Sequence, residues 1–152
     1  MNEIKPNYFN KFSQAKANEL GIKPTAILRD YMYVAQDPVD QLLLGPAYGI
    51  GRLLERAGLT VDDIDVWEIH EAFAGQVLAN LEACKDESFC QKSMGIKSAV
   101  GEVPMDKLNN WGGSLSMGHP FGATGIRLVS HCANRLKVNV ILIFGFQKCI
   151  YI

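Results

Sequence analysis

A glycine-rich segment with one histidine is the densest candidate for chemistry in this sequence. Residues 112–125 read GGSLSMGHPFGATG, and their five glycines let the backbone pass close to a ligand or to another backbone. Pro120 disfavours helical geometry at His119, so we expect His119 to be the N-cap of the helix that follows. The helix dipole would there disfavour the imidazolium form. A neutral imidazole at a loop–helix junction can act as a general base near neutral pH.

Two other interpretations of this segment are open on spacing alone. His119 could be only a cap and the glycines only tight turns, or the loop could cradle a phosphate. It is not a Walker loop, because no Gly-Lys-Ser/Thr follows the glycines. Ser114 and Ser116 precede His119 but form no Gly-x-Ser-x-Gly nucleophile elbow.

The second candidate is the motif His70-Glu71-Ala72-Phe73. It lies between an expected buried strand and an expected helix, where α/β sheets usually place their sites. Burying His70 and Glu71 without partners would be costly. The alternative is a strand-end histidine followed by a helix-capping glutamate. A helical His-Glu-x-x-His zinc site is excluded because residue 74 is alanine, and we predict no metal.

The cysteines suggest neither a metal site nor a catalytic pair. None of the four forms a Cys-x-x-Cys pair, and a few scattered thiols suit a reducing compartment: Cys84, Cys90, Cys132 and Cys149. His131 adjoins Cys132 on an expected helix, where neighbouring side chains point apart. We therefore expect buried or merely unpaired cysteines.

Alternating helices and strands must position these residues. Apolar spacing and capping signals predict helices over 13–20 and 45–57, around 74–81 and after 125, and strands over 25–34, 64–69 and 138–146. Residues 60–63 look like a capping box, and 85–107 look irregular. The order predicts an α/β layered domain over residues 13–152, with 1–12 as an unstructured end.

Length and charge narrow the class of protein further. The chain has 152 residues, with 15 Lys+Arg against 16 Asp+Glu and a net charge of −1, which suits one compact domain. This balance gives no electrostatic reason to expect nucleic acid or an acidic membrane as a partner. No apolar run approaches the roughly 18 residues of a membrane helix, and no secretory or Arg-rich transit peptide is visible.

Taken together, the two motifs resemble the thiolase family. That family has an (Asn/His)-Glu-Ala-Phe motif and, some tens of residues later, Gly-Gly-x-x-x-x-Gly-His-Pro-x-Gly-x-(Thr/Ser)-Gly, in the order and at the separation found here. Residues 28–38, 40–46 and 109–113 are similar to its mitochondrial branch, the 3-ketoacyl-CoA thiolases that form the β subunits of trifunctional complexes. The likeness covers roughly residues 14–137. It implies a thiolase-like layered αβα fold, present here as one truncated C-terminal half-domain whose final strand region is aberrant.

The resemblance implies an acyltransferase of fatty-acid β-oxidation, an acetyl-CoA C-acyltransferase that cleaves 3-ketoacyl-CoA with coenzyme A. By similarity, His119 would deprotonate a cysteine nucleophile and contribute to an oxyanion hole, while His70 would hold a water in that hole. Glu71 would orient neighbouring polar groups. Substrate and coenzyme A would contact Ala72, Phe73 and Gly118. Coenzyme A would be a substrate, and no cofactor is implied.

The resemblance also predicts the partners of this chain, its location and whether it is active by itself. It implies acyl-CoA and CoA as ligands, thiolase subunits in a homo-oligomer, a trifunctional α subunit, a mitochondrial location, and membrane association only through that complex. The nucleophilic cysteine and most of the CoA site lie in the family's N-terminal domain, so we expect these 152 residues alone to be inactive. Cys149 lacks the glycines that follow the family's second cysteine. One alternative is a non-catalytic protein that associates with full thiolase subunits. Another is a biosynthetic or sterol-carrier-type thiolase, which the mitochondrial-like segments disfavour.

Overall fold

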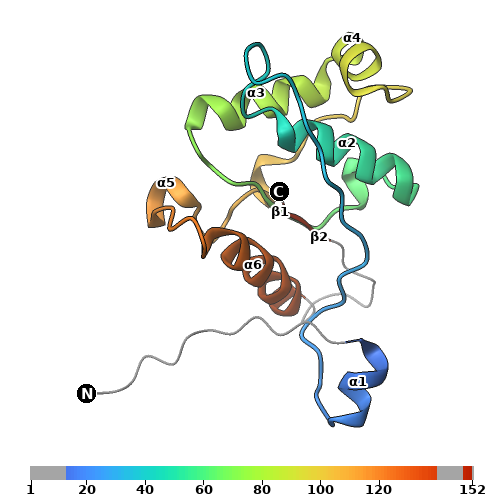
Figure 1. Cartoon of the computed structure of the whole chain (residues 1–152), viewed down its shortest axis with the longest axis vertical. Coiled ribbons are helices and arrows are strands. Elements are labelled where there is room, and N and C mark those ends of the chain that lie inside the picture. The colour runs from blue at the N-terminus through green and yellow to red at the C-terminus, as the bar shows by residue number, and fades with distance from the viewer. Residues whose placement is uncertain (1–12, 140–148, 152) are drawn as a thin grey trace.

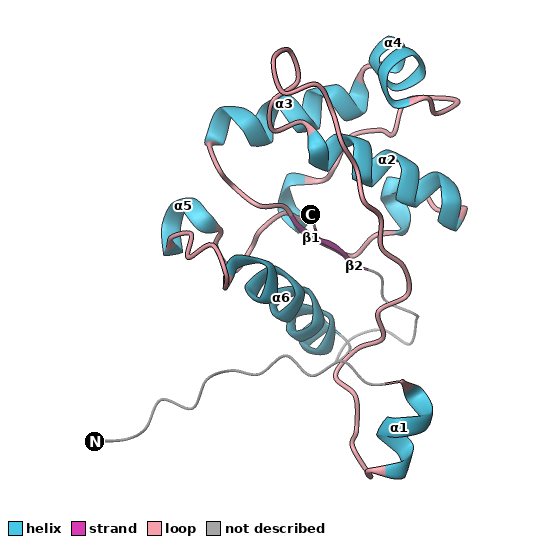
Figure 2. Cartoon of the chain, in the orientation of Figure 1, coloured by secondary structure: helices cyan, strands magenta, loops and turns pink. Residues whose placement is uncertain are grey.

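The computed structural model describes residues 13–139 and 149–151, which form helices on both sides of a small parallel sheet (Figures 1 and 2). The elements are α1 (Gln14–Glu19), α2 (Gly45–Ala57), η1 (Val61–Asp63), β1 (Val66–Glu68), α3 (Ala74–Lys85), α4 (Glu87–Phe89), η2 (Cys90–Met94), η3 (Met105–Lys107), α5 (Ser114–Met117), α6 (Thr124–Asn139) and β2 (Cys149–Tyr151). Helices α2 and α3 pack together on one side of the sheet, and α6 lies on the other (Figure 1). The arrangement confirms the predicted layered α/β class.

Strand β1 is the centre of this arrangement. It pairs in parallel with β2, with Val66 opposite Cys149, and Trp67 forms an isolated parallel bridge with Leu108. Its three residues, the charged Glu68 among them, are fully buried, which is typical of a central strand. The strand predicted over 138–146 is wrong where it can be compared, because α6 continues through Asn139. Residues 140–146 lie outside the described part of the chain.

Local signals position the first two helices as predicted. Ser13 Oγ accepts a hydrogen bond from the N–H of Lys16 and caps α1. Pro46 stands in the first turn of α2, and Gly58 ends this helix in the left-handed conformation, with φ of 64°. The capping box at Thr60 and Asp63 also forms, around η1.

A buried amide connects the two helices above the sheet. Asn80 of α3 accepts from the N–H of Ala47 at 2.9 Å and donates to the carbonyls of Leu43 and Gln76, each at 2.8 Å. The Ala47 N–H at the start of α2 also donates to the Leu44 carbonyl at 3.1 Å, and the bond to Leu43 holds the loop before the helix. Asn80 therefore connects α2, α3 and this loop in one layer.

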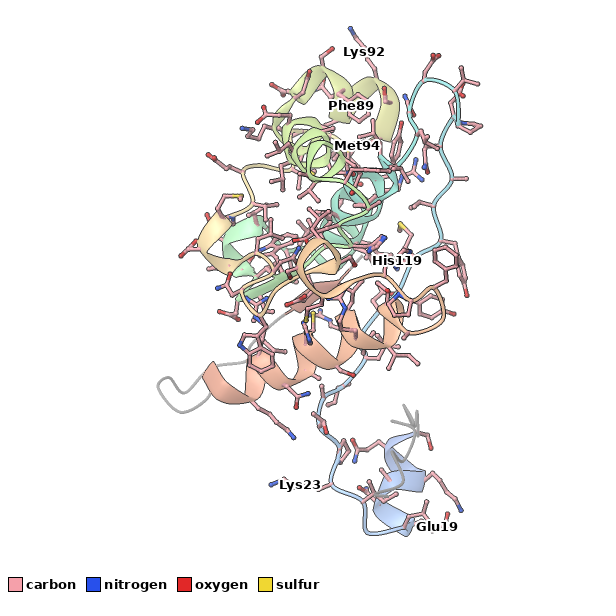
Figure 3. The ribbon with its side chains drawn as sticks, turned by 90° about the vertical axis from the view of Figure 1, so that its left-hand side faces the viewer. Glu19, Lys23, Phe89, Lys92, Met94 and His119 are labelled. Atoms are coloured by element: carbon pink, nitrogen blue, oxygen red, sulfur yellow. The ribbon has the colours of Figure 1, made fainter. Side chains whose placement is uncertain are left out.

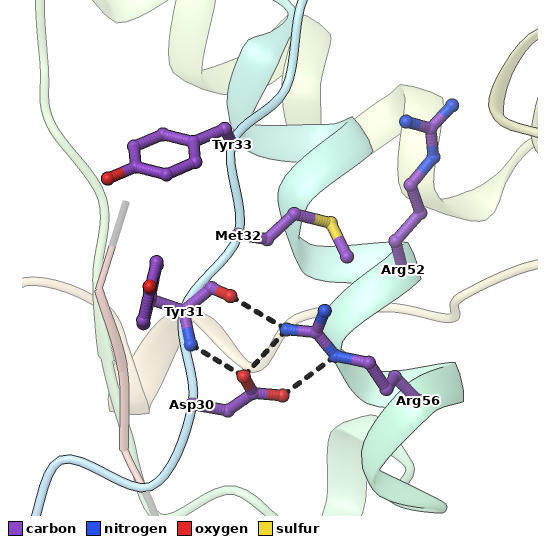
Figure 4. A pocket seen from close by; sticks show the side chains of 6 residues that line it. All are labelled: Asp30, Tyr31, Met32, Tyr33, Arg52 and Arg56. Carbon is purple, nitrogen blue, oxygen red and sulfur yellow. Dashed lines mark hydrogen bonds and ion pairs between the residues drawn. The ribbon is translucent and has the colours of Figure 1, made fainter.

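The prediction of a strand over residues 25–34 is wrong. The segment is extended but joins no sheet, and most of it is exposed (Figure 2). It leaves α1 and runs alongside α2, where Arg56 binds the Asp30 carboxylate through two nitrogens and donates to Tyr31 O at 2.7 Å (Figure 4). Alternating side chains make a strand only where a neighbouring strand offers its backbone, and among the described residues none does so here.

An open pocket of about 570 Å³ lies between this extended segment and α2 (Figure 4). Its lining comprises Asp30, Tyr31, Met32, Tyr33, Arg52 and Arg56. None of the residues in the two sequence motifs contributes to it. The Arg56 contacts show that this region anchors the extended segment to the helix.

The region 85–107, expected to be irregular, contains three short helical turns. Residues Cys90–Met94 form a π-helical turn, which Gly95 ends with φ of 72°. Met94 is buried against Gly51 of α2, where a side-chain Cβ would come within 2.7 Å of Met94 Cε. Within residues 13–139 and 149–151, no helix is long and apolar enough to cross a membrane.

Candidate active site

The fold brings the two histidines of the sequence motifs into direct contact. His70 follows the buried end of β1, and His119 lies in the loop between α5 and α6. Their ring centroids are 4.2 Å apart and their planes are inclined by 39°. In Figure 3, His119 lies between α6 and the upper helical layer. Two motifs distant in the sequence therefore form one site at the edge of the layered domain.

The hydrogen bonds of His119 assign its protons. Its Nδ1 lies 2.7 Å from Oγ1 of Thr124, and that hydroxyl donates its single hydrogen to the Pro120 carbonyl. Thr124 Oγ1 therefore accepts from Nδ1–H, which we infer from the hydrogen-bond pattern. The lone pair of the neutral ring is then on Nε2. A histidine in this tautomer can take a proton from a thiol or hydroxyl through Nε2.

His70 has a different set of neighbours. Its Nδ1 lies 2.9 Å from Oγ of Ser114, and Arg127 donates to the same oxygen at 2.8 Å. The pKa of His70 is lowered, and burial of the ring is the largest cause. His119 and Arg127 lower this pKa further, whereas Glu71 raises it. The burial of the ring and its two cationic or titratable neighbours together favour its neutral form.

Glu71 binds groups from two other segments. Its Oε1 accepts from the amide of Asn109 at 2.7 Å, and its Oε2 accepts from the N–H of Leu115 at 3.2 Å. Asn109 also binds both the N–H and the carbonyl of Ile69, each at 2.9 Å. Glu71 thus connects the end of β1 to the start of α5 and holds the two motifs together.

The Glu71 carboxylate lies so close to the backbone of residue 113 that only glycine, which has no Cβ, fits there. Gly113 has φ of −121°, which is open to any residue, but an added Cβ would overlap the Glu71 carboxylate. We expect Gly113→Ala to displace this carboxylate and to lower the free energy of unfolding by about 1–3 kcal/mol. Urea unfolding measures this change. Gly75→Ala in α3 is the matched control, because an added Cβ has nothing within 4 Å, and it should be neutral or slightly stabilising. Equal stability of the two variants would contradict the prediction.

The expected N-cap role of His119 is wrong, and the alternative interpretation of Glu71 as a helix cap does not hold either. His119 is not the N-cap of α6, because a turn at residues 121–123 separates it from Thr124, the first helical residue. Glu71 does not cap α3. Instead, Gln76 accepts from the N–H groups of Ala72 and Phe73 at 3.1 and 3.5 Å, which leaves the Glu71 carboxylate for the contacts above.

Of the three residues expected to contact substrate, two are exposed and one is half-buried. Ala72 is half-buried, and the Phe73 side chain is 65% exposed. Gly118 is exposed and has φ of 96°, a backbone conformation that favours glycine. The substrate contacts expected of them stay predictions.

Cys84 and Cys90 are buried between α3 and η2. Burial, aided by Cys90, raises the pKa of Cys84 to about 12, and the Cys90 thiol lies 3.4 Å from the Ala83 carbonyl. A thiol acts as a nucleophile through its thiolate, so these two positions suit packing and not catalysis. Among the described residues, no cluster of three His, Cys, Asp or Glu side chains could hold a metal ion.

Sequence reasoning missed the residues that support the site. Asn109 has φ of 47° and binds both the strand end and Glu71, while Thr124 and Arg127 orient the two histidines. Thr124 stands inside the glycine-rich segment, which could have singled it out. Arg127 has no such signal, because an arginine one turn into a helix usually faces solvent.

Comparisons with known proteins show the family of this chain. Residues 22–143 match the model of the thiolase C-terminal domain. A probable 3-ketoacyl-CoA thiolase of Caenorhabditis elegans is 68% identical over 117 residues, which are 77% of this chain and 26% of that protein. The mitochondrial trifunctional enzyme subunit beta of Bos taurus is 62% identical over 125 residues, 82% of this chain and 26% of the relative.

A solved structure supports the fold independently. The acetyl-CoA acetyltransferase of Syntrophomonas wolfei superposes with a TM-score of 0.67 at 32% identity, over 84% of this chain and 29% of that one. The chain thus spans about a quarter of the length of the curated relatives above. With most of its residues matched by the domain model and its two motifs joined in one site, the chain belongs to the thiolase family, in the C-terminal domain of that fold.

Proposed function

We propose that this chain supplies the base and part of the oxyanion hole of a 3-ketoacyl-CoA thiolase, an acetyl-CoA C-acyltransferase of fatty-acid β-oxidation. The observation that carries the proposal is the contact between the His70 and His119 rings, with the Nε2 lone pair of His119 free of its Thr124 hydrogen bond. A base beside a second polar ring suits a reaction that takes a proton from a thiol and builds charge on a carbonyl oxygen.

The proposed chemistry is thiolysis in two stages. Nε2 of His119 takes the proton of a cysteine thiol, and the thiolate attacks the 3-keto carbon of the acyl-CoA. The carbon–carbon bond then breaks, the carbon that leaves takes the proton held by His119, and acetyl-CoA departs. Coenzyme A accepts the shortened acyl group from the cysteine. His70 stabilises the oxygen on which charge develops, directly or through a water, and Glu71 keeps the His70 loop against α5.

The nucleophile in this proposal comes from a part of the fold that these 152 residues do not include. Cys84 and Cys90 are buried, and the raised pKa of Cys84 leaves almost no thiolate near neutral pH. We therefore propose that the chain performs thiolysis only together with a thiolase N-terminal domain. The name of the Bos taurus relative, a mitochondrial trifunctional enzyme subunit beta, supports a mitochondrial location and a multi-subunit complex. We propose that this complex includes further thiolase subunits and a trifunctional α subunit.

The test is thiolysis by the intact protein that carries this sequence. The protein is incubated with a long-chain 3-ketoacyl-CoA, with and without coenzyme A, and products are measured by mass spectrometry. We expect acetyl-CoA and an acyl-CoA shortened by two carbons in equal amounts, and only when coenzyme A is present. Absence of the shortened product would overturn the proposal.

A second candidate function is non-catalytic association with full thiolase subunits, which the burial of Cys84 and Cys90 favours. It predicts that the 152-residue chain, added to an active thiolase, co-elutes with its subunits and changes activity without thiolysis of its own. Size-exclusion chromatography followed by the thiolysis assay on the same fractions separates the two candidates.

A further inference from the structure

An arginine and a serine stand behind His70, on the side away from its Nε2. Ser114 is 7% exposed at the start of α5, and Arg127 reaches it from the first turns of α6. The distances are 2.8 Å from the Arg127 guanidinium to Ser114 Oγ and 2.9 Å from that oxygen to Nδ1 of His70. Three groups from three segments thus form one chain of hydrogen bonds.

Donor and acceptor counting gives this chain a direction. A guanidinium can only donate, so Ser114 Oγ accepts from Arg127. The single hydroxyl hydrogen of Ser114 is then left for Nδ1 of His70, its other hydrogen-bond partner in the described part of the chain. Nδ1 therefore accepts, and the proton of the neutral His70 ring is on Nε2.

The two neighbouring rings consequently carry their protons on different nitrogens. The Thr124 hydroxyl accepts from His119 because its hydrogen is used by the Pro120 carbonyl, so Nε2 of His119 is an acceptor. The Ser114 hydroxyl donates to His70, so Nε2 of His70 is a donor. Two hydroxyls, each oriented by its own second partner, set opposite roles for rings 4.2 Å apart.

We propose that Arg127 and Ser114 are positioning residues that hold His70 as its Nε2–H tautomer, so that it donates a hydrogen bond to the reacting carbonyl oxygen while His119 accepts a proton. The oxyanion part of this proposal rests on the thiolase function proposed above, whereas the tautomer part does not. Of the charged and titratable groups around the His70 ring, all but one favour its neutral form. Arg127 and His119 disfavour a charged His70, and Glu71 favours it.

The direct test is the protonation state of the rings in the ¹⁵N-labelled 152-residue chain. Long-range ¹H–¹⁵N NMR correlations distinguish Nδ1–H from Nε2–H for each histidine. We expect Nε2–H at His70 and Nδ1–H at His119. Ser114→Ala should produce a mixture of tautomers at His70 alone, and Ser114→Thr, which keeps the hydroxyl, should restore Nε2–H. A wild-type His70 with Nδ1–H, or one unchanged by Ser114→Ala, would overturn the proposal.

Arg127→Gln gives a second, independent measurement. Removing this positive charge should raise the pKa of His70 towards its ordinary value, and Arg127→Lys should keep the pKa low. The titration is read from the same NMR spectra, and circular dichroism confirms that each variant is folded. If Ser114→Ala does not fold, the wild-type spectrum still decides: a His70 ring with its proton on Nδ1 would contradict the proposal.

Kinetics in the intact protein connect the tautomer to catalysis. We expect Ser114→Ala to lower kcat for thiolysis by roughly 10- to 100-fold with little change in KM, as for other groups that orient a catalytic residue. Ser116→Ala is the control, because the bonds of the Ser116 hydroxyl within the described residues go to the backbone of Gly113 and to neither histidine. Thiolysis that is absent in wild type, with the predicted tautomers present, would refute the function alone. Undiminished thiolysis in Ser114→Ala would refute the positioning role alone.

Discussion

His119→Gln in the intact protein that carries this sequence should lower kcat for thiolysis by about 10²–10⁴-fold, the contribution typical of a positioned general base. The reason is the geometry at its ring. Thr124 occupies Nδ1, so the proton acceptor is Nε2, and His119 touches the second site histidine, His70. Steady-state kinetics with a long-chain 3-ketoacyl-CoA measures the loss.

Two further variants show whether the fall in kcat comes from losing the base at position 119. Thr124→Val removes the hydroxyl that receives Nδ1–H while keeping the side-chain volume, and it should cause a smaller fall in kcat. His131→Gln makes the same exchange at a histidine on α6 that contacts Trp111 and Glu68, and it should leave kcat within about twofold. If His119→Gln retains wild-type kcat, His119 is not the base.

The largest effect on stability should come from Arg135→Met. Arg135, 5% exposed on α6, pairs with Glu68 of β1, which is fully buried. Its guanidinium also donates to the carbonyls of Trp67 and Lys107 at 3.0 and 2.8 Å. Methionine leaves a buried carboxylate without its counter-charge. Breaking such a pair costs about 3–5 kcal/mol, which is a large part of the stability of an ordinary domain.

Chemical denaturation of the chain measures this loss, and two variants control it. Arg56→Met breaks the half-exposed pair with Asp30 and should cost about 1 kcal/mol or less. The double variant Glu68→Gln with Arg135→Met removes the stranded charge and should recover part of the stability. Equal losses for Arg135→Met and Arg56→Met would show that the Glu68 pair contributes no more than a surface pair.

Local sequence signals determined much of the fold. The caps at Ser13 and Gly58 and the capping box at residues 60–63 were predictable because each depends on neighbours along the chain. The strand expected over 64–69 also forms, as β1. The same signals failed over residues 25–34, where alternation of apolar side chains predicts a strand. Whether a strand forms depends on a partner strand, which no local pattern specifies.

Some features of the candidate site were also predictable from the sequence, and others were not. Residue types alone made His119, His70 and Glu71 candidates. A histidine before a proline in a glycine-rich loop and a polar pair after a buried strand both suit chemistry, although purely structural interpretations stayed open. Only the tertiary structure showed that the two rings touch and that Ser114 and Arg127 lie behind one of them. The protonated nitrogen of an imidazole is set by whichever group lies against the other nitrogen. Those groups come from segments distant in sequence, and folding alone brings them together.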